Sequence, residues 1–354
     1  MASSARPKGA LPLREFDLIR AIRKQHSHRN ASIIQGIGDD AAITALSEDQ
    51  WQILTTDLLA EGIHFDLRIV TFSDVGFRAG VANLSDIAAM GGIPQYLLVT
   101  LAIPRTGTAR QVQQLYRGMM ASCRPYKVSL VGGDISGSTS GWFLAITLIG
   151  TVAQDRALLR SGARVGDDLY VTGTLGDSLA GLELLRRFRS GSASSTLSPH
   201  YRQFLVRRHV HPTARVAIGQ WLSTKRWASS AIDISDGLSG DLRHICEESR
   251  VGAEIDLAAL PLSPACRAYA RSAGLDPITL ALAGGEDYEL LFTVPARSRA
   301  GFERMTTRQR VPITRIGMIR PARSGLHGIL PNGRRQPLRV TSYEHFRSLR
   351  GRIS

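Results

Sequence analysis

Apolar and polar positions along this chain recur with two periods, which predict helices and strands in turn. Residues 71–90 carry apolar side chains such as Val75 and Ala79 at helical spacing, and Gly91 ends the pattern, so a helix is predicted there. The unbroken apolar and β-branched run over 96–103 instead predicts a buried strand. Further helices are predicted over 15–24, 108–126, 177–188, 238–249, 263–273 and 299–308, and further strands over 51–57, 128–131, 142–152, 168–172, 231–234, 253–257 and 288–294.

The order of these elements predicts the fold class. Adjacent strands are mixed with helical crossovers, which favours a mixed α/β (α+β) fold over a repeating βαβ array. The pattern restarts after Gln154, so we expect an N-terminal domain over 15–153 and a C-terminal domain over 154–346. Residues 1–14 are predicted to be a disordered basic N-terminus, 347–354 a basic tail, and the Gly/Ser-rich stretch 190–198 a surface loop.

The composition and the first residues predict where in the cell the protein is found. Hydrophobic residues make up 43% of the 354 residues, and no apolar run approaches the roughly 20 residues that span a bilayer. The first ten residues are polar and basic and lack an apolar signal core, so a cytoplasmic protein is predicted. The three cysteines are odd in number and far apart, which supports neither a disulfide framework nor a CxxC zinc site.

The net charge of +14, from 44 basic and 30 acidic residues, is compatible with nucleic acid, a membrane surface or anionic small molecules as partners. The basic residues are dispersed, and aromatic residues make up only 6% of the chain, so no aromatic-interleaved basic stripe is present. We therefore interpret the surplus as a solvated surface and keep nucleic-acid binding as a minor alternative.

Candidate chemistry lies in six aspartates, each within a short segment of glycine, serine or threonine. They are Asp40, Asp57, Asp86, Asp134, Asp233 and Asp236. Mg²⁺ prefers oxygen ligands and is usually shared between carboxylates and substrate phosphates. Small neighbouring residues let the backbone approach a bulky anion. The pattern predicts a metal-assisted phosphate site.

The placement of these segments refines that hypothesis. Gly132-Gly133-Asp134 follows an apolar run, so we expect its carboxylate at a strand end, pointing into a cleft. Asp233 and Ser235 share one side of a strand at period two, and the helix that follows offers backbone N–H groups to phosphate. Each segment also has an ordinary interpretation, such as a turn, a helix cap or an exposed helix position.

Familiar nucleotide-binding motifs are absent from the sequence. It contains no GxxxxGK[ST] loop, no GxGxxG with an acid at the Rossmann distance, and no HRD and DFG pair. ATP would therefore have to bind through another architecture.

Taken together and in this order, the segments resemble thiamine-monophosphate kinase over about 16–346. The resemblance is carried by Gly36-Ile37-Gly38-Asp39-Asp40, Thr55-Thr56-Asp57, Asn83-Leu84-Ser85-Asp86, Gly132-Gly133-Asp134, Arg160-Ser161-Gly162, Asp233-Ile234-Ser235-Asp236-Gly237 and Gly284-Gly285-Glu286-Asp287-Tyr288-Glu289. It implies the two-domain fold of the aminoimidazole-ribonucleotide synthetase superfamily and a homodimer whose N-terminal sheets form a barrel. The implied reaction is direct transfer of the γ-phosphoryl group of ATP to thiamine monophosphate, with several Mg²⁺ ions and no phospho-enzyme.

The resemblance also implies roles for individual residues. The Mg²⁺ ligands would be Asp40, Thr55, Thr56, Asp57, Asp86, Asp134, Asp233 and Asp236; ATP would contact Tyr116, Gly133, Asp134, Arg160 and Ser235; thiamine phosphate would contact His64, Glu286 and Tyr343. Three of these residues have plainer interpretations: His64 as a core or surface histidine, Arg160 as a salt-bridge partner, and Tyr343 as packing of the C-terminal segment.

Sister enzymes of the superfamily are the nearest alternatives, aminoimidazole-ribonucleotide synthetase among them. A selenide water dikinase would need a reactive cysteine near the N-terminus, whereas the first cysteine here is Cys123. A hydrogenase carbamoyl-dehydrating protein would need a terminal cysteine, whereas this chain ends at Ser354. A basic nucleic-acid-binding protein would instead show salt-sensitive binding and no turnover.

Overall fold

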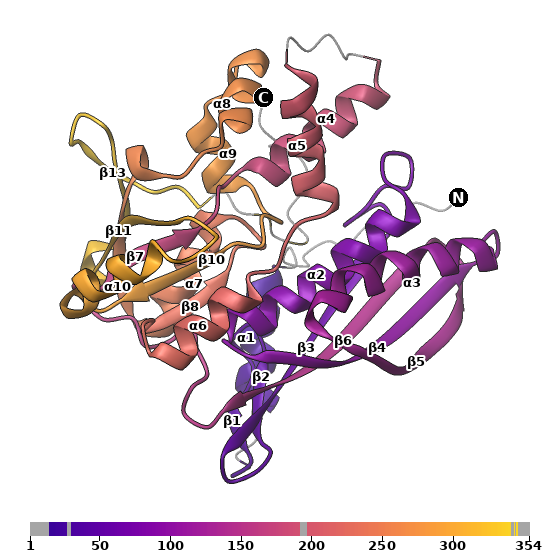
Figure 1. Ribbon diagram of the computed structural model, residues 1–354, viewed down its shortest axis with the longest axis horizontal. Coiled ribbons are helices and arrows are strands. Elements are labelled where there is room, and N and C mark those ends of the chain that lie inside the picture. Colours follow the sequence, from indigo (N-terminus) through magenta and orange to yellow (C-terminus); the bar gives the residue numbers. More distant parts are fainter. Residues whose placement is uncertain (1–13, 27–29, 192–196, 341–342, 344, 346–354) are drawn as a thin grey trace, which may run out of the picture.

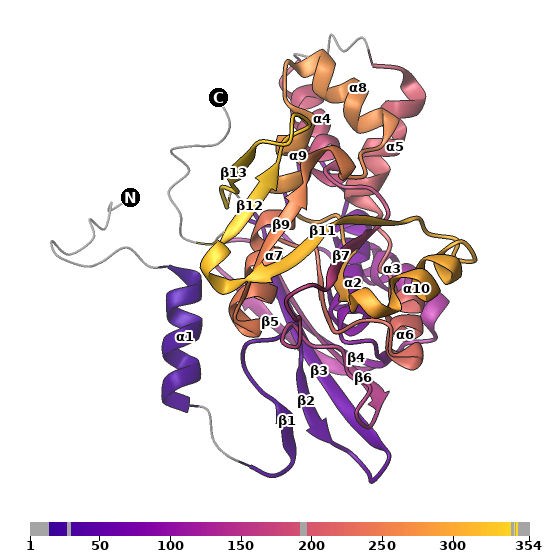
Figure 2. The same cartoon turned by 90° about the vertical axis from the view of Figure 1, so that its left-hand side faces the viewer.

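The structure is a computed structural model that describes residues 14–26, 30–191, 197–340, 343 and 345. Most of the predicted N-terminal segment and 190–198 loop, and all of the 347–354 tail, lie outside the described residues. Figures 1 and 2 show two sheet-based units side by side. Across the described residues, no helix combines the length and apolarity that crossing a membrane requires.

The first unit is a six-stranded sheet with helices on one face. Its strands run in the order β1-β2-β3-β6-β4-β5, with β4 and β5 parallel and the other pairs antiparallel. The elements are α1 (Glu15–His26), β1 (Ile33–Gln35), β2 (Ala42–Ala45), β3 (Gln50–Ala60), α2 (Phe72–Ala89), β4 (Ile93–Pro104), α3 (Ala109–Cys123), β5 (Ser129–Ser138) and β6 (Phe143–Ala153). Helices α2 and α3 pack together over the same face of this sheet (Figure 1).

The second unit is a seven-stranded sheet in the order β13-β12-β9-β11-β7-β10-β8, in which only β12 and β9 pair in parallel. Its strands are β7 (Asp168–Thr172), β8 (Ser230–Asp233), β9 (Val251–Asp256), β10 (Leu290–Val294), β11 (Ile313–Pro321), β12 (Leu326–Ile329) and β13 (Arg335–Pro337). Its helices are α4 (Asp177–Arg189), α5 (Pro199–Val210), α6 (Val216–Lys225), α7 (Leu238–Ser249), α8 (Pro264–Ala273), α9 (Pro277–Ala283) and α10 (Arg299–Thr306). The mixed α/β fold predicted from the sequence is confirmed.

Helix α2 joins the two units. The Thr71 hydroxyl accepts from the Asp74 N–H at 3.2 Å while the Asp74 carboxylate accepts from the Thr71 N–H at 2.9 Å, a capping box that fixes the start of the helix. Most of α2 is buried, and α6 of the second unit packs on it. A Cβ at Gly219 would lie 1.9 Å from the carbonyl oxygen of Ala88, so only glycine allows this approach. Side chains on α2 are therefore held rigidly between the domains.

Several predicted elements are confirmed, and one is wrong in a way that affects the site. The helices over 71–90 and 238–249 are found as α2 and α7. The strand predicted to stop at Val131 instead continues to Ser138, so Gly132-Gly133-Asp134 lies within β5 and not at a strand end. Both faces of this edge strand are exposed, so no apolar alternation marks its length. Helix α9 and strands β11 to β13 were not predicted.

Candidate functional site

Three carboxylates from different elements meet between the two domains. Asp40 lies in the turn before β2, Asp86 in the buried helix α2, and Asp233 at the end of β8. One oxygen of each carboxylate lies within 4.8 Å of the others. We refer to these three residues as the acidic cluster. It requires both domains, because Asp40 and Asp86 come from the first and Asp233 from the second.

Full ionisation of the acidic cluster would place more negative charge there than its surroundings neutralise. Burial, followed by repulsion from Asp40, raises the pKa of Asp233 to about 8. Burial, followed by repulsion from Asp57 and Asp233, raises the pKa of Asp86 well above its ordinary value. The Oδ2 atoms of Asp40 and Asp233 are buried without a hydrogen-bond partner. An all-oxygen donor set with unpaired buried oxygens fits a hard divalent cation.

Arg160 is the cation nearest to this cluster. Its guanidinium donates to Asp40 Oδ1 from Nη2 at 2.5 Å and from Nε at 3.1 Å, and its backbone N–H donates to Asp39. Burial still raises the pKa of Asp40, because the attraction of Arg160 offsets only part of the desolvation. One arginine is therefore not enough to balance the site, and its side chain remains 20% exposed, where an anion can reach it.

The two threonines before Asp57 lie on opposite faces of β3. The Thr55 hydroxyl donates to the Asp86 carboxylate, on the face covered by α2. The Thr56 hydroxyl donates to the Ile146 carbonyl oxygen at 3.0 Å and is exposed on the other face. Asp57 shares the inner face with Thr55, and burial together with Asp40 raises its pKa to about 6. The structure thus brings Thr55 and Asp57 toward the acidic cluster and turns the Thr56 side chain away.

Asp134 is also separated from the cluster, contrary to the expectation that its carboxylate points into the cleft. In the sheet register Asp134 pairs with Thr100, whereas Asp57 belongs to the row of Val99 and Gly133. Paired residues project to the same face, so Asp134 lies on the exposed outer face with Thr100. The strand does not end at Gly133; it continues past it, and this places Asp134 on the outer face.

The turn after β8 adds further acids to the site. Burial, followed by Glu15, raises the pKa of Asp236 to about 7. The Ser235 hydroxyl donates weakly to Asp233 at 3.5 Å. Asp241 on α7 was not among the residues predicted, yet it is buried and accepts from the Gly237 N–H at 3.0 Å. The sequence does contain a signal for Asp241, because an acidic residue in the first turn of a helix, four positions after Gly237, can accept from a free backbone N–H at the helix start.

The three residues that the resemblance assigns to the substrate pocket are linked through two residues that were not predicted. Buried Arg78 forms an ion pair with Glu286 and donates to the His64 carbonyl oxygen at 3.3 Å. His345 places Nε2 3.3 Å from Nε2 of His64 and Nδ1 3.4 Å from the Tyr343 hydroxyl. We refer to His64, Glu286 and Tyr343 as the pocket group.

The pocket group adjoins the turn that follows β8. The Glu286 N–H donates to the Ser235 carbonyl oxygen at 2.8 Å, and the Tyr343 N–H donates to the Asp236 carbonyl oxygen at 3.1 Å. A ligand held by the pocket group would therefore lie beside the acidic cluster. Arg78 had a sequence signal as well, because a lone basic residue in a buried apolar helix requires an acidic partner.

Two predicted nucleotide contacts lie outside these groups. Tyr116 is half-buried on α3, where it packs against the apolar core of the first domain. Gly133 approaches β4 so closely that a Cβ would lie 1.9 Å from the Val99 carbonyl oxygen. Glycine is therefore required at this position for β5 to pack against β4. Neither position brings the residue into the acidic cluster.

Comparisons with known proteins agree with this two-domain arrangement. Residues 38–152 match the family described as AIR synthase related protein, N-terminal domain. Residues 164–327 match AIR synthase related protein, C-terminal domain.

Two relatives that match most of this chain carry the same name. Thiamine-monophosphate kinase of Escherichia coli strain K12 is 37% identical over 95% of this chain and 97% of its own length. The Aquifex aeolicus protein of that name is 39% identical over 84% of this chain and 92% of its own length. A solved structure described as AaThiL complexed with AMPPCP and TMP matches with a TM-score of 0.80 and 35% identity, covering 97% of this chain and all of that one.

Proposed function

The chain belongs to the thiamine-monophosphate kinase family, and we propose that it transfers the γ-phosphoryl group of ATP directly to thiamine monophosphate at the junction of its two domains. The product is thiamine diphosphate. The observation that carries the site assignment is the meeting of Asp40, Asp86 and Asp233 within 4.8 Å, with buried oxygens that lack partners. ATP-using sister activities are not favoured, because relatives at 37–39% identity are named for this kinase.

We propose that Mg²⁺ is held by Asp40, Asp86 and Asp233, with Asp57 and Asp236 close by. When bound, it would neutralise phosphate oxygens that these carboxylates otherwise repel. Thr55 keeps the Asp86 carboxylate oriented by donating to it. Asp40 in turn fixes Arg160, whose partly exposed guanidinium is placed to contact a phosphate. Thr56 could contribute only its backbone oxygen as a Mg²⁺ ligand, because its side chain faces away from the acidic cluster.

The remaining residues would bind and orient the acceptor. In this proposal His64, Glu286 and Tyr343 hold thiamine monophosphate beside the acidic cluster, and Ser235 lies where the two ligands meet. The attacking oxygen belongs to a phosphate that is already largely ionised near pH 7. A strong general base is therefore not required, and catalysis rests on positioning and charge neutralisation.

We further propose that the active form is a homodimer, as the resemblance implies. The outer face of the first sheet and its edge strand expose large apolar side chains, among them Leu58 at 55% and Ile135 at 62%. Asp134 lies on this face, so its proposed role in binding Mg²⁺ and ATP requires a second copy to close over it. Tyr116 and Gly133 remain proposed nucleotide contacts, and a cytoplasmic location remains a prediction.

The test is an assay of purified protein with Mg-ATP and thiamine monophosphate, in which thiamine diphosphate is measured. We expect turnover by the wild type, loss of turnover in Asp57→Asn, and little change in the control variant Asp49→Asn, which neutralises an exposed acid of the same domain. Glu286→Ala should raise KM for thiamine monophosphate more than KM for ATP. Near-normal turnover of Asp57→Asn at saturating Mg²⁺ would overturn the metal assignment.

A further inference from the structure

The segment that carries Glu286 has a strained backbone. Glu286 has φ 62° and Tyr288 has φ 52°, so two side-chain-bearing residues of one short segment adopt the left-handed region. A residue with a side chain adopts this region only at a cost in conformational energy. The segment therefore keeps this shape only if its surroundings hold it.

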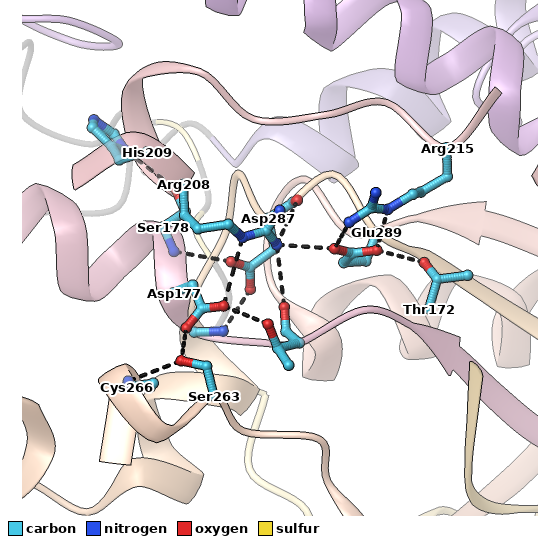
Figure 3. Close-up of polar contacts among 12 residues, drawn as sticks. Thr172, Asp177, Ser178, Arg208, His209, Arg215, Ser263, Cys266, Asp287 and Glu289 are labelled. Carbon is cyan, nitrogen blue, oxygen red and sulfur yellow. Dashed lines mark hydrogen bonds and ion pairs between the residues drawn. The ribbon is translucent and has the colours of Figure 1, made fainter. Parts of the chain in front are cut away.

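Side chains of this segment alternate between two destinations. Glu286 reaches the first domain, where it meets Arg78. Asp287 and Glu289 are fully buried in the second domain instead. The Asp287 carboxylate accepts from the N–H groups of Gly176 at 2.6 Å and Ser178 at 3.0 Å, at the start of α4 (Figure 3). Burial raises the pKa of Asp287 to about 7, while Arg208 and these two N–H groups at the helix N-terminus lower it.

Glu289 is held by two arginines. Arg215 binds both of its carboxylate oxygens, with Nε 2.6 Å from Oε2, and Arg208 donates to Oε1 at 2.9 Å (Figure 3). The Thr172 hydroxyl also donates to it at 2.6 Å. Burial would raise the pKa of Glu289, but Arg215 and Arg208 lower it below the ordinary value, so this residue stays charged and paired.

Arg208 ties this network to the strained segment. Its Nη2 donates to the backbone carbonyl oxygen of Asp287 at 3.5 Å and of Thr174 at 3.3 Å, and its Nε lies 3.5 Å from Asp177. The next residue on α5, His209, places Nδ1 3.7 Å from the Glu286 carboxylate. Helix α5 therefore contacts the strained segment twice: Arg208 bonds to its backbone, and His209 lies beside the Glu286 carboxylate.

We propose that Arg208 and Arg215 are positioning residues for the acceptor substrate. Through Asp287 and Glu289 they fix the strained segment, so that Glu286 keeps its ion pair with Arg78 and its place in the pocket group. This rests on the proposed function, in which Glu286 contacts thiamine monophosphate. Neither arginine touches the substrate or the acidic cluster in this scheme, so their loss should affect acceptor binding more than ATP binding.

The experiment compares Arg215→Met with a matched control. Arg299 makes the same kind of two-pronged bond to buried Asp168 on the same sheet, at 2.5 and 2.6 Å, but Asp168 pairs with Val294, at the end of β10 that lies away from Glu289. Arg215→Met should raise KM for thiamine monophosphate about tenfold, the effect of losing one charged hydrogen bond, while KM for ATP changes less than about twofold. Arg299→Met should change neither constant, although it should lower thermal stability.

A double-mutant cycle with Glu286→Ala shows whether the arginine acts through Glu286. We expect Arg215→Met to add little to KM for thiamine monophosphate once Glu286 is gone. Additive effects, or an Arg215→Met variant that behaves like Arg299→Met, would overturn the positioning role alone. Absence of any effect of Glu286→Ala would overturn the pocket assignment as well. If Arg215→Met does not fold, Arg215→Lys keeps the charge while losing the two-pronged bond, and the same KM comparison applies.

Discussion

Replacement of Asp86 by asparagine should stabilise the metal-free protein while abolishing its response to Mg²⁺. Asp86 lies on a buried helix, where burial and repulsion from Asp57, Asp233 and Asp40 raise its pKa. The hydrogen bond from the Thr55 hydroxyl lowers the pKa and offsets only part of this rise. Asparagine has nearly the same shape and can still accept from Thr55. The variant therefore removes negative charge from the acidic cluster without creating a cavity.

The size of this effect follows from the geometry. Two ionised carboxylates at 4.8 Å, the upper limit of the oxygen separations in the acidic cluster, repel by about 3.5 kcal/mol at an effective dielectric constant of about 20. Partial protonation reduces that figure, because the pKa of Asp233 already stands at about 8. We expect a gain of about 1–2 kcal/mol in the free energy of unfolding, which raises Tm by roughly 3–6 °C for domains of this size.

Differential scanning calorimetry of the wild type and of Asp86→Asn measures both effects. Scans in EDTA give the stability of the metal-free protein, and scans in excess Mg²⁺ give the stabilisation by the metal. Mg²⁺ at about a hundredfold excess over its Kd should stabilise the wild type by about 2.7 kcal/mol and should stabilise the variant far less. Glu254→Gln, at a partly exposed acid of the second domain that is paired with Arg320, serves as the control for a general charge effect. A variant less stable than the wild type in EDTA, or one with an undiminished Mg²⁺ response, would contradict charge repulsion and Mg²⁺ binding at Asp86.

Three further predictions follow from the placement of single residues. Asp134→Asn should abolish kinase turnover with a Tm in EDTA within about 2 °C of the wild type, since an exposed strand residue contributes little to stability; retained turnover would contradict its proposed role. Leu58→Glu should convert the proposed homodimer to monomers in analytical ultracentrifugation and reduce turnover, whereas an unchanged sedimentation coefficient would argue against the outer face as the interface. Burial lowers the pKa of His209 to about 3, and the unfolded chain takes up a proton below about 6.5, so stability due to this residue is lost as pH falls between these values. The free energy of unfolding, measured by urea denaturation at pH 7, 5 and 4, should therefore fall less steeply with falling pH in His209→Gln than in the wild type. The difference in slope should be about 1.4 kcal/mol per pH unit.

Much of the fold was predictable because local patterns carried it. Helix α2 is marked by apolar residues at helical spacing and by Thr71 and Asp74 at its start, and it is found where the pattern places it. The strands buried on both faces are equally clear. Strand β5 was predicted too short, because its glycines and exposed residues resemble a turn when the neighbouring strand β4 is unknown.

Substrate-pocket chemistry was only partly predictable. His64 and Glu286 stand in recognisable segments, but the residue that joins them, Arg78, lies between those segments in a helix that otherwise reads as core. The same holds for Arg208 and Arg215, which look like dispersed surface charges in the sequence and prove to be nearly buried. A buried basic residue signals that an acidic partner exists but not which one, and the partner of Arg208 and Arg215 lies more than 70 positions away along the chain.

The amino-acid sequence is enough to establish the two-domain order, the aspartate-bearing segments and the family, since these depend on residues near one another along the chain or on the order of short segments. Which of those residues act together depends on the tertiary structure. It places Asp40 beside Asp233 across the domain junction. It also turns Thr56 and Asp134 to the outer face of the first sheet. The physical reason is that a strand residue's face depends on its register with neighbouring strands, and distant charges approach one another only when burial of the apolar core brings their elements together.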